Sequence, residues 1–261
     1  MTRACPFPGQ GGDSRQAASG EGCVKTGTGL LDEYRKDVER VFGGNLVSLT
    51  VYGSHATVTP DPGDPIGVLL VADSLTRETL AAYHTVAHKY VRRGIPAPPL
   101  FTEAFLRESA DVFPIEFLAM MERRRVLSGR DVLEGLPIST ANLRHQVEFE
   151  LKGKYLSLAR MYMGTFGKKE LGELVRNTVG PVVDVARGLL LLKEADAPHG
   201  KEQVVDGIER AFDVRLPNIR EALGHRSRGK IPPARVEDLF FGYLSEVERL
   251  CSLSDRFPEG P

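Results

Sequence analysis

The residues of this sequence that could carry out chemistry lie in several short groups. His84 and His88 are four residues apart, so they share one face of a helix and could hold a metal ion together. No glutamate accompanies them in the metalloprotease pattern, and a pair of surface histidines is the simpler interpretation. Asp61 and Asp64 are three residues apart in a turn rich in proline and glycine, where aspartates are favoured by hydrogen bonds to the backbone.

A glycine and a serine, Gly53 and Ser54, stand between two segments that we expect to be strands. Leu46–Tyr52 alternates apolar and polar residues and is rich in β-branched side chains, which is typical of a strand. Beyond the turn, Ile66–Ala72 is an almost unbroken apolar run, which predicts a buried central strand. The two residues therefore end one strand and lead into the loop that precedes the other.

Glu116 lies in a third segment that we expect to be a strand, Val112–Phe117. The proline at position 114 favours an edge position or a bulge, because it cannot donate a hydrogen bond to a neighbouring strand. A carboxylate on a half-buried strand is unfavourable unless it has a partner. Two interpretations of Glu116 are therefore open, a functional acid or a surface carboxylate paired with Arg123 or Arg124.

Helical periodicity surrounds the expected strands and then replaces them. After Ser139 the strand pattern disappears, and long amphipathic helices are expected. The apolar positions that mark these helices fall in the ranges 143–162, 171–190 and 236–250. The sequence therefore predicts an α+β fold, with a mixed sheet and helices over residues 30–138, an all-helical bundle over 139–255 and a disordered tail over 1–29.

The composition is that of a globular protein and excludes several classes. Thirty-four Lys and Arg residues against 35 Asp and Glu give a net charge of −1, which argues against a dedicated nucleic-acid-binding protein. The apolar stretches are far shorter than a membrane span, and the N-terminal segment lacks the apolar core of a signal peptide. The three cysteines have no metal-ligand spacing, so we expect a reduced, cytoplasmic protein with no membrane partner.

The segment Val51-Tyr52-Gly53-Ser54, followed by Ile66-Gly67-Val68-Leu69-Leu70-Val71, resembles the opening of the nucleotidyltransferase superfamily. In that family the glycine lets the backbone approach a triphosphate, and the serine and nearby N–H groups bind its oxygens. Two acidic residues alternate along the next strand and hold Mg²⁺, and a third carboxylate from a later strand helps to activate the attacking hydroxyl. A helical second half also follows the catalytic domain in kanamycin-type members. The resemblance implies that Gly53 and Ser54 bind a nucleoside triphosphate.

The sequence departs from the family pattern at the metal ligands. Aligned on the apolar run, the two acidic positions fall on Pro65 and Gly67, which have no side chain that could bind a metal. Asp61 and Asp64 lie just upstream and would have to form a displaced site. On the resemblance, Glu116 stands for the third carboxylate. The implied metal ligands are then Asp61, Asp64 and Glu116, with Asp64 and Glu116 as the catalytic acids.

The functions that remain open follow from these departures. Lys152 and Lys154, on the first helix of the bundle, are expected to overhang a bound nucleotide. The protein is then either a degenerate member that binds a nucleotide, a protein partner or a second copy of itself, or an active Mg²⁺-dependent nucleotidyltransferase with an unknown acceptor. The spacing of Arg220 and His225 resembles that of ribonucleases of the HEPN helical family, which is a third hypothesis.

Overall fold

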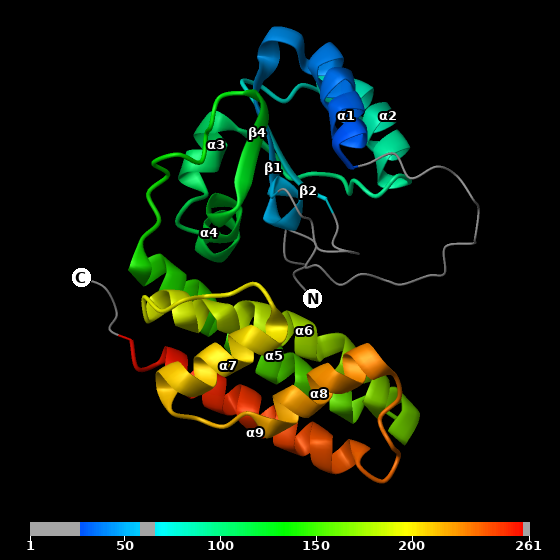
Figure 1. The fold of residues 1–261 in the computed structure, drawn as a ribbon, viewed down its shortest axis with the longest axis vertical. Coiled ribbons are helices and arrows are strands. Elements are labelled where there is room, and N and C mark those ends of the chain that lie inside the picture. The colour runs from blue at the N-terminus through cyan, green and yellow to red at the C-terminus, as the bar shows by residue number, and fades with distance from the viewer. Residues whose placement is uncertain (1–26, 58–65, 258–261) are drawn as a thin grey trace. The chain divides into compact units, whose positions relative to one another are not determined.

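The structure is a computed structural model that describes residues 27–57 and 66–257 (Figure 1). Within these residues the chain forms two compact units, which meet in the sequence between Ile138 and Ser139. Each unit has buried apolar residues of its own. Of the predicted tail, residues 1–26 lie outside the described residues, and positions 27–29 begin the first helix.

The first unit is built on a four-stranded sheet with helices on both of its sides (Figure 1). Its strands are β1 (Leu46–Tyr52), β2 (Gly67–Ala72), β3 (Leu100–Thr102) and β4 (Arg124–Gly129). Their order across the sheet is β3-β2-β1-β4, with β1 antiparallel to both of its neighbours and β2 parallel to β3. The two strands predicted around Gly53 are thus confirmed, and they pair with each other in one sheet.

Two pairs of helices cover the sheet. The helices of this unit are α1 (Gly27–Phe42), α2 (Arg77–Val91), α3 (Glu103–Glu108) and α4 (Pro114–Glu122), with short 3-10 turns η1 (Gly43–Asn45) and η2 (Gly53–Ala56). α1 and α2 lie side by side on one side of the sheet, and α3 and α4 lie on the other (Figure 1). Leu49 and Val51 of β1 belong to the core under α1 and α2, where the hydroxyls of Tyr34 and Tyr83 are 2.5 Å apart.

The prediction of a third strand over Val112–Phe117 is wrong. Helix α4 begins at Pro114, and proline is favoured in the first turn of a helix because its fixed φ fits and its missing N–H would have no partner there. Glu116 therefore lies in the first turn of a helix. The other two strands of the sheet are β3 and β4 instead.

The second unit is a helical bundle. Its described helices are α5 (Thr140–Met163), α6 (Lys168–Leu192), α7 (Lys201–Phe212), α8 (Pro217–Arg228) and α9 (Val236–Ser254). α6 packs against each of the other four helices, and most of its apolar residues are buried. Between Ser139 and Phe257 the structure contains no strand, as the sequence predicts. No helix in the described part of the chain is long and apolar enough to cross a membrane.

A buried carboxylate joins α8 to α9. Glu246 of α9 is only 4% exposed, and it accepts hydrogen bonds from the backbone N–H groups of Asn218 (2.9 Å) and Ile219 (2.7 Å). The side-chain amide of Asn218 donates a third bond to Glu246, at 2.6 Å. Asn218 also lies against Gly242, where a Cβ would be 2.4 Å from its side chain. The carboxylate thus satisfies N–H groups of the first turn of α8, which have no acceptor in their own helix.

Candidate functional site

The turn that follows β1 is held by backbone hydrogen bonds. Gly53 has a φ of +77°, a conformation that favours glycine, and its N–H donates to the carbonyl of Arg123 at 2.9 Å. The carbonyl of Ser54 accepts from the Thr57 hydroxyl at 2.6 Å and from the Thr57 N–H at 3.1 Å. The Ser54 side chain is nearly buried, and its Oγ lies 3.4 Å from Nδ1 of His55. Gly53 and Ser54 therefore form a defined turn at the end of a central strand.

The tyrosine that precedes this turn covers the residue opposite to it. Tyr52 and Gly67 are partners in the antiparallel register of β1 and β2. A Cβ at position 67 would be 2.6 Å from Cε2 of the Tyr52 ring and 2.9 Å from Cδ2. Burial raises the pKa of the Tyr52 hydroxyl above its usual value, so the ring is neutral. The position where the family pattern has its second acid is thus a glycine under an aromatic ring.

The strand on the other side of β1 brings arginines to the same end of the sheet. Arg124 is fixed in place, because its Nε donates to Asp131 at 2.8 Å and its Nη1 donates to the carbonyl of Met121 at 2.5 Å. Arg123 and Arg125 flank it and are exposed. Among the residues that the structure describes, no carboxylate pairs with either of them. Two of the three arginines are thus exposed without a carboxylate partner among residues 27–57 and 66–257.

Glu116 reaches the neighbourhood of the turn on a helix. α4 packs against η2, so the structure brings the element that carries Glu116 beside Gly53 and Ser54. Glu116 is half-buried, and its position lies about 9 Å along the helix axis from the end of α4 at Glu122. The residue after that end, Arg123, is the one bonded to Gly53. A role of Glu116 as an acid in this site stays a prediction.

Asp61, Asp64 and Pro65 lie outside the described residues. Within residues 27–57 and 66–257, no group of three or more His, Cys, Asp or Glu side chains could hold a metal ion. His84 and His88 do stack, with ring centroids 6.5 Å apart, but they are a pair without a third ligand in that part of the chain.

The predicted lysines take part in ion pairs within the helical bundle. The Nζ of Lys152 donates to Glu148 at 2.6 Å and to Asp255 at 2.9 Å, and these contacts raise the pKa of Lys152 above its usual value. Lys154 donates to Glu150, one helical turn earlier, at 3.3 Å. That either lysine contacts a nucleotide stays a prediction.

Arg220 and His225 each have a carboxylate of their own. Arg220 forms ion pairs with Asp206 and Glu209 of α7, both at 2.7 Å. His225 lies 3.8 Å from Glu221, one turn earlier in α8. In a helix, residues five apart point about 140° away from each other, so the pair of the ribonuclease motif does not share a face.

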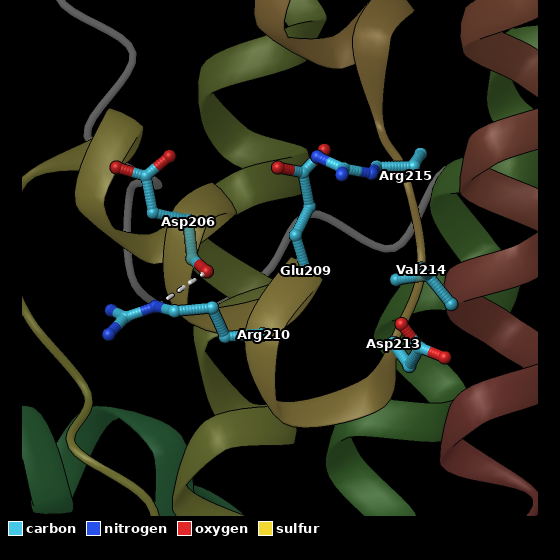
Figure 2. A pocket seen from close by; sticks show the side chains of 6 residues that line it. All are labelled: Asp206, Glu209, Arg210, Asp213, Val214 and Arg215. Carbon is cyan, nitrogen blue, oxygen red and sulfur yellow. Dashed lines mark hydrogen bonds between the residues drawn. The ribbon is translucent and has the colours of Figure 1, made fainter.

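A surface pocket at the end of α7 was not indicated by the sequence (Figure 2). Its volume is about 440 Å³, and its lining is mostly charged: Asp206, Glu209, Arg210, Asp213, Val214 and Arg215. Nε of Arg210 donates to the backbone carbonyl of Asp206 at 3.2 Å, and the carboxylates of Asp206 and Glu209 are taken up by Arg220. These contacts join α7 to α8. The sequence does not predict the pocket, because charged residues near the end of a helix are common on any solvent-facing surface.

Comparison with known proteins supports the fold. No family profile matches the sequence, and no curated protein matches it. Among solved structures, the chain is similar to spectinomycin adenyltransferase AAD(9) from Enterococcus faecialis, determined with ATP and spectinomycin. The TM-score is 0.57 at 11% sequence identity, and the match covers 88% of this chain and 100% of the other. An α+β unit with the Gly-Ser turn between two central strands, followed by a helical bundle, gives this protein the nucleotidyltransferase fold.

Proposed function

We propose that this protein binds a nucleotide at the end of β1 and transfers nucleotidyl groups weakly or not at all. The observation that carries the proposal is the difference between two parts of one site. The Gly53-Ser54 turn is kept at the end of a central strand, whereas the metal-ligand position on the next strand is Gly67, covered by Tyr52. The similar spectinomycin adenyltransferase structure contains ATP, which supports a nucleotide as the ligand class.

The loss of catalysis before binding follows from the chemistry of the reaction. Transfer of a phosphoryl-type group depends on the positions of the reactants and on metal ions that neutralise developing charge. A site that lacks one of its paired carboxylates cannot fix both ions against the triphosphate. Phosphate binding by a turn and by arginine side chains has no such requirement. We therefore expect nucleotide binding to be retained in a member of this fold that has lost its transfer activity.

Calorimetry with ATP, GTP, CTP and UTP, each with and without Mg²⁺, tests the proposal. We expect at least one of the four to bind, and Gly53→Ala to weaken that binding, because the φ of +77° strains any residue with a Cβ. Gly135→Ala is the matched control, since Gly135 also has a positive φ, of +69°, but lies outside the site. The absence of binding for all four nucleotides would remove the proposal.

The alternative is an active Mg²⁺-dependent nucleotidyltransferase that uses Asp61, Asp64 and Glu116. The packing of α4 against η2 favours it, because this brings the helix of Glu116 beside the turn. In either case we propose a cytoplasmic setting and, as a partner besides the nucleotide, another protein or a second copy of the chain; the support for these comes from the sequence alone.

A further inference from the structure

We propose that His84 and His88 of α2 bind a divalent transition-metal ion such as Zn²⁺ together with the same two histidines of a second copy of this chain. The bound ion then joins the two molecules on a two-fold axis. The inference goes beyond the proposed function, because it concerns the outer face of α2 and not the turn that follows β1. It makes the protein a metal-dependent homodimer.

The first argument is that the two histidines point away from the core, on a helix that is held by its other face. Tyr83 and Tyr90 of α2 are buried. The Tyr83 hydroxyl lies 2.5 Å from that of Tyr34, and the Tyr90 hydroxyl donates to Asp37 at 2.8 Å, so both tyrosines bind α2 to α1. At about 100° per residue, the histidines lie about 110–150° around the helix from the mean direction of these tyrosines. A metal ion on the outer face therefore leaves the packing of α2 unchanged.

The second argument is the arrangement of the two rings. They extend side by side, with centroids 6.5 Å apart and an angle of 22° between their planes. Both side chains are exposed, and among the described residues neither has a hydrogen bond or an ion pair. Rotation about their χ angles can therefore bring one nitrogen of each ring to a single ion, at the bond length of about 2.0–2.1 Å between zinc and imidazole. A spacing of four residues on a helix is also the one at which two histidines share a zinc ion.

The third argument is that the pair is only half of a metal site. Zinc takes four ligands in a tetrahedron, and the pair supplies two. Within residues 27–57 and 66–257, no third His, Cys, Asp or Glu joins the two histidines in a possible metal site. A second copy that brings its own pair completes a set of four imidazoles. Imidazole suits zinc and its neighbours among the transition metals, whereas Mg²⁺ prefers oxygen ligands, so the site selects a transition metal.

The fourth argument is that this face of α2 has the same order of side chains in both directions. Leu80, His84, His88 and Val91 follow one another at almost even intervals, within an arc of about 80°. Leu80 and Val91 are large apolar residues, yet they are 41% and 50% exposed. When two copies of α2 pack antiparallel about the level of residue 86, each His84 faces the partner's His88, and each Leu80 lies beside the partner's Val91. A two-fold interface requires such a face, one that is its own complement.

Sedimentation velocity of the full chain without a histidine tag, in EDTA and in rising concentrations of ZnCl₂, tests the inference. We expect a monomer in EDTA and a dimer in ZnCl₂, with saturation at one Zn²⁺ for two chains. His84→Gln and His88→Gln should each raise the zinc concentration at half-dimerisation by at least about tenfold, since even groups that only orient a metal ligand contribute that much. His145→Gln removes another exposed histidine, on α5, and should change nothing.

A second variant separates the metal from the contact between helices. Leu80→Glu combined with Val91→Glu places charge at both ends of the stripe and should weaken the zinc-dependent dimer while both histidines stay in place. Both positions are at least 41% exposed, so we expect the variant to fold, which far-UV circular dichroism checks. A dimer of unchanged affinity in this folded variant would overturn the antiparallel packing of α2 on α2.

The remaining outcomes bear on the metal and on the second copy. The same oligomeric state in EDTA and in ZnCl₂, or an assembly larger than a dimer, would overturn the inference. So would a zinc-dependent dimer that is unchanged in His84→Gln and His88→Gln, because the ion would then be bound elsewhere. One Zn²⁺ bound by each monomer would overturn the part given to the second copy. None of these results bears on nucleotide binding, which calorimetry measures separately, so the inference and the proposed function fail independently.

Discussion

The ring of Tyr52 lies over Gly67, its partner across the β1–β2 ladder, with Cε2 2.6 Å from the place of a Cβ at position 67. The sequence resemblance aligns Gly67 with one of the metal-binding acids of the nucleotidyltransferase family. A glycine that makes room for a neighbouring ring has a packing role, and such a role fixes its identity as firmly as a catalytic role would. The two positions are therefore coupled, and substitutions at one should be read together with the other.

The first prediction concerns this coupling. Gly67→Ala should destabilise the protein by about 1–3 kcal/mol, since the added methyl group forces the Tyr52 ring to move. In a Tyr52→Leu background the same substitution should have a smaller effect, because the ring is gone. Urea unfolding followed by far-UV circular dichroism, on the four members of the double-mutant cycle, measures the difference. Equal effects in both backgrounds would contradict the coupling.

The second prediction concerns Gly129 at the end of β4. Its φ is +78°, and a Cβ there would lie 2.1 Å from the carbonyl oxygen of Val47. Gly129→Ala should destabilise the protein by about 2–4 kcal/mol, from backbone strain and from the clash together. Gly135→Ala is the control, because Gly135 also has a positive φ but has open space around it, and it should lose only about 1 kcal/mol. If thermal unfolding showed the same loss of stability for Gly129→Ala and Gly135→Ala, the contact with Val47 would make no contribution.

The third prediction concerns acid stability. Arg93, followed by Lys89, holds the pKa of Glu33 at about 2, below its ordinary value of 4.5. Because the pKa is lowered in the folded state, the stabilisation is present above pH 4.5 and is lost as the pH falls towards 2. Glu33→Gln should therefore flatten the decline of stability over that interval, as measured by urea unfolding at a series of pH values.

The control for the acid experiment is Glu39→Gln. Glu39 pairs with Arg35 in the same helix, at 3.2 Å, whereas Glu33 joins α1 to α2 through Lys89. We expect Glu39→Gln to change the acid limb less than Glu33→Gln does. A curve for Glu33→Gln that is parallel to that of the unaltered protein from pH 4.5 to 2 would contradict the assignment.

The fourth prediction concerns the buried carboxylate of Glu246. Glu246→Gln should destabilise the protein by about 1.5–3 kcal/mol. The amide nitrogen of the glutamine would replace a carboxylate oxygen that accepts hydrogen bonds from N–H groups of α8, and those N–H groups would lose their acceptor. Glu248→Gln, an exposed position on the same helix, is the matched control and should be close to neutral. Thermal unfolding of the two variants side by side makes the comparison, and a similar shift in both would be inconsistent with a specific role for Glu246.

The fifth prediction concerns turnover. Labelled ATP, GTP, CTP and UTP, incubated with the protein, Mg²⁺ or Mn²⁺ and candidate acceptors, should release no pyrophosphate above the background rate. The reason is that Gly67, which aligns with one of the two paired metal-binding acids, has no carboxylate. Robust turnover that disappears in Asp64→Asn or Glu116→Gln would establish the active alternative instead.

The sequence predicts the central part of the sheet well and its edges poorly. Leu46–Tyr52 and Ile66–Ala72 are long enough for alternation and for an unbroken apolar run to be read, and both are strands. β3 has three residues, too few for any period, and β4 opens with arginines, which conceal its apolar positions. The segment at Val112–Phe117 is a short apolar run, and such a run fits a helix as well as a strand, so Pro114 at the first helical position decides the outcome.

The site could be predicted only as far as local sequence reaches. Gly53 and Ser54 were recognisable because the strand, the turn and the next strand are consecutive in the chain. The contact of Tyr52 with Gly67 depends on the register of β1 and β2, and a shift of one residue between these strands would abolish the contact. The position of Arg123 opposite Gly53 depends on which strand pairs with β1, and no local pattern contains that information.

Helix α6 has a consequence for the way the bundle forms during synthesis. It packs against all four of the other helices, and α9, one of its partners, is made more than forty residues later. While the chain is still emerging from the ribosome, the apolar side of α6 that α9 will cover has nothing to pack against. Such surfaces are the ones that chaperones bind and through which nascent chains aggregate. We therefore expect this unit to reach its final packing only after α9 has been made.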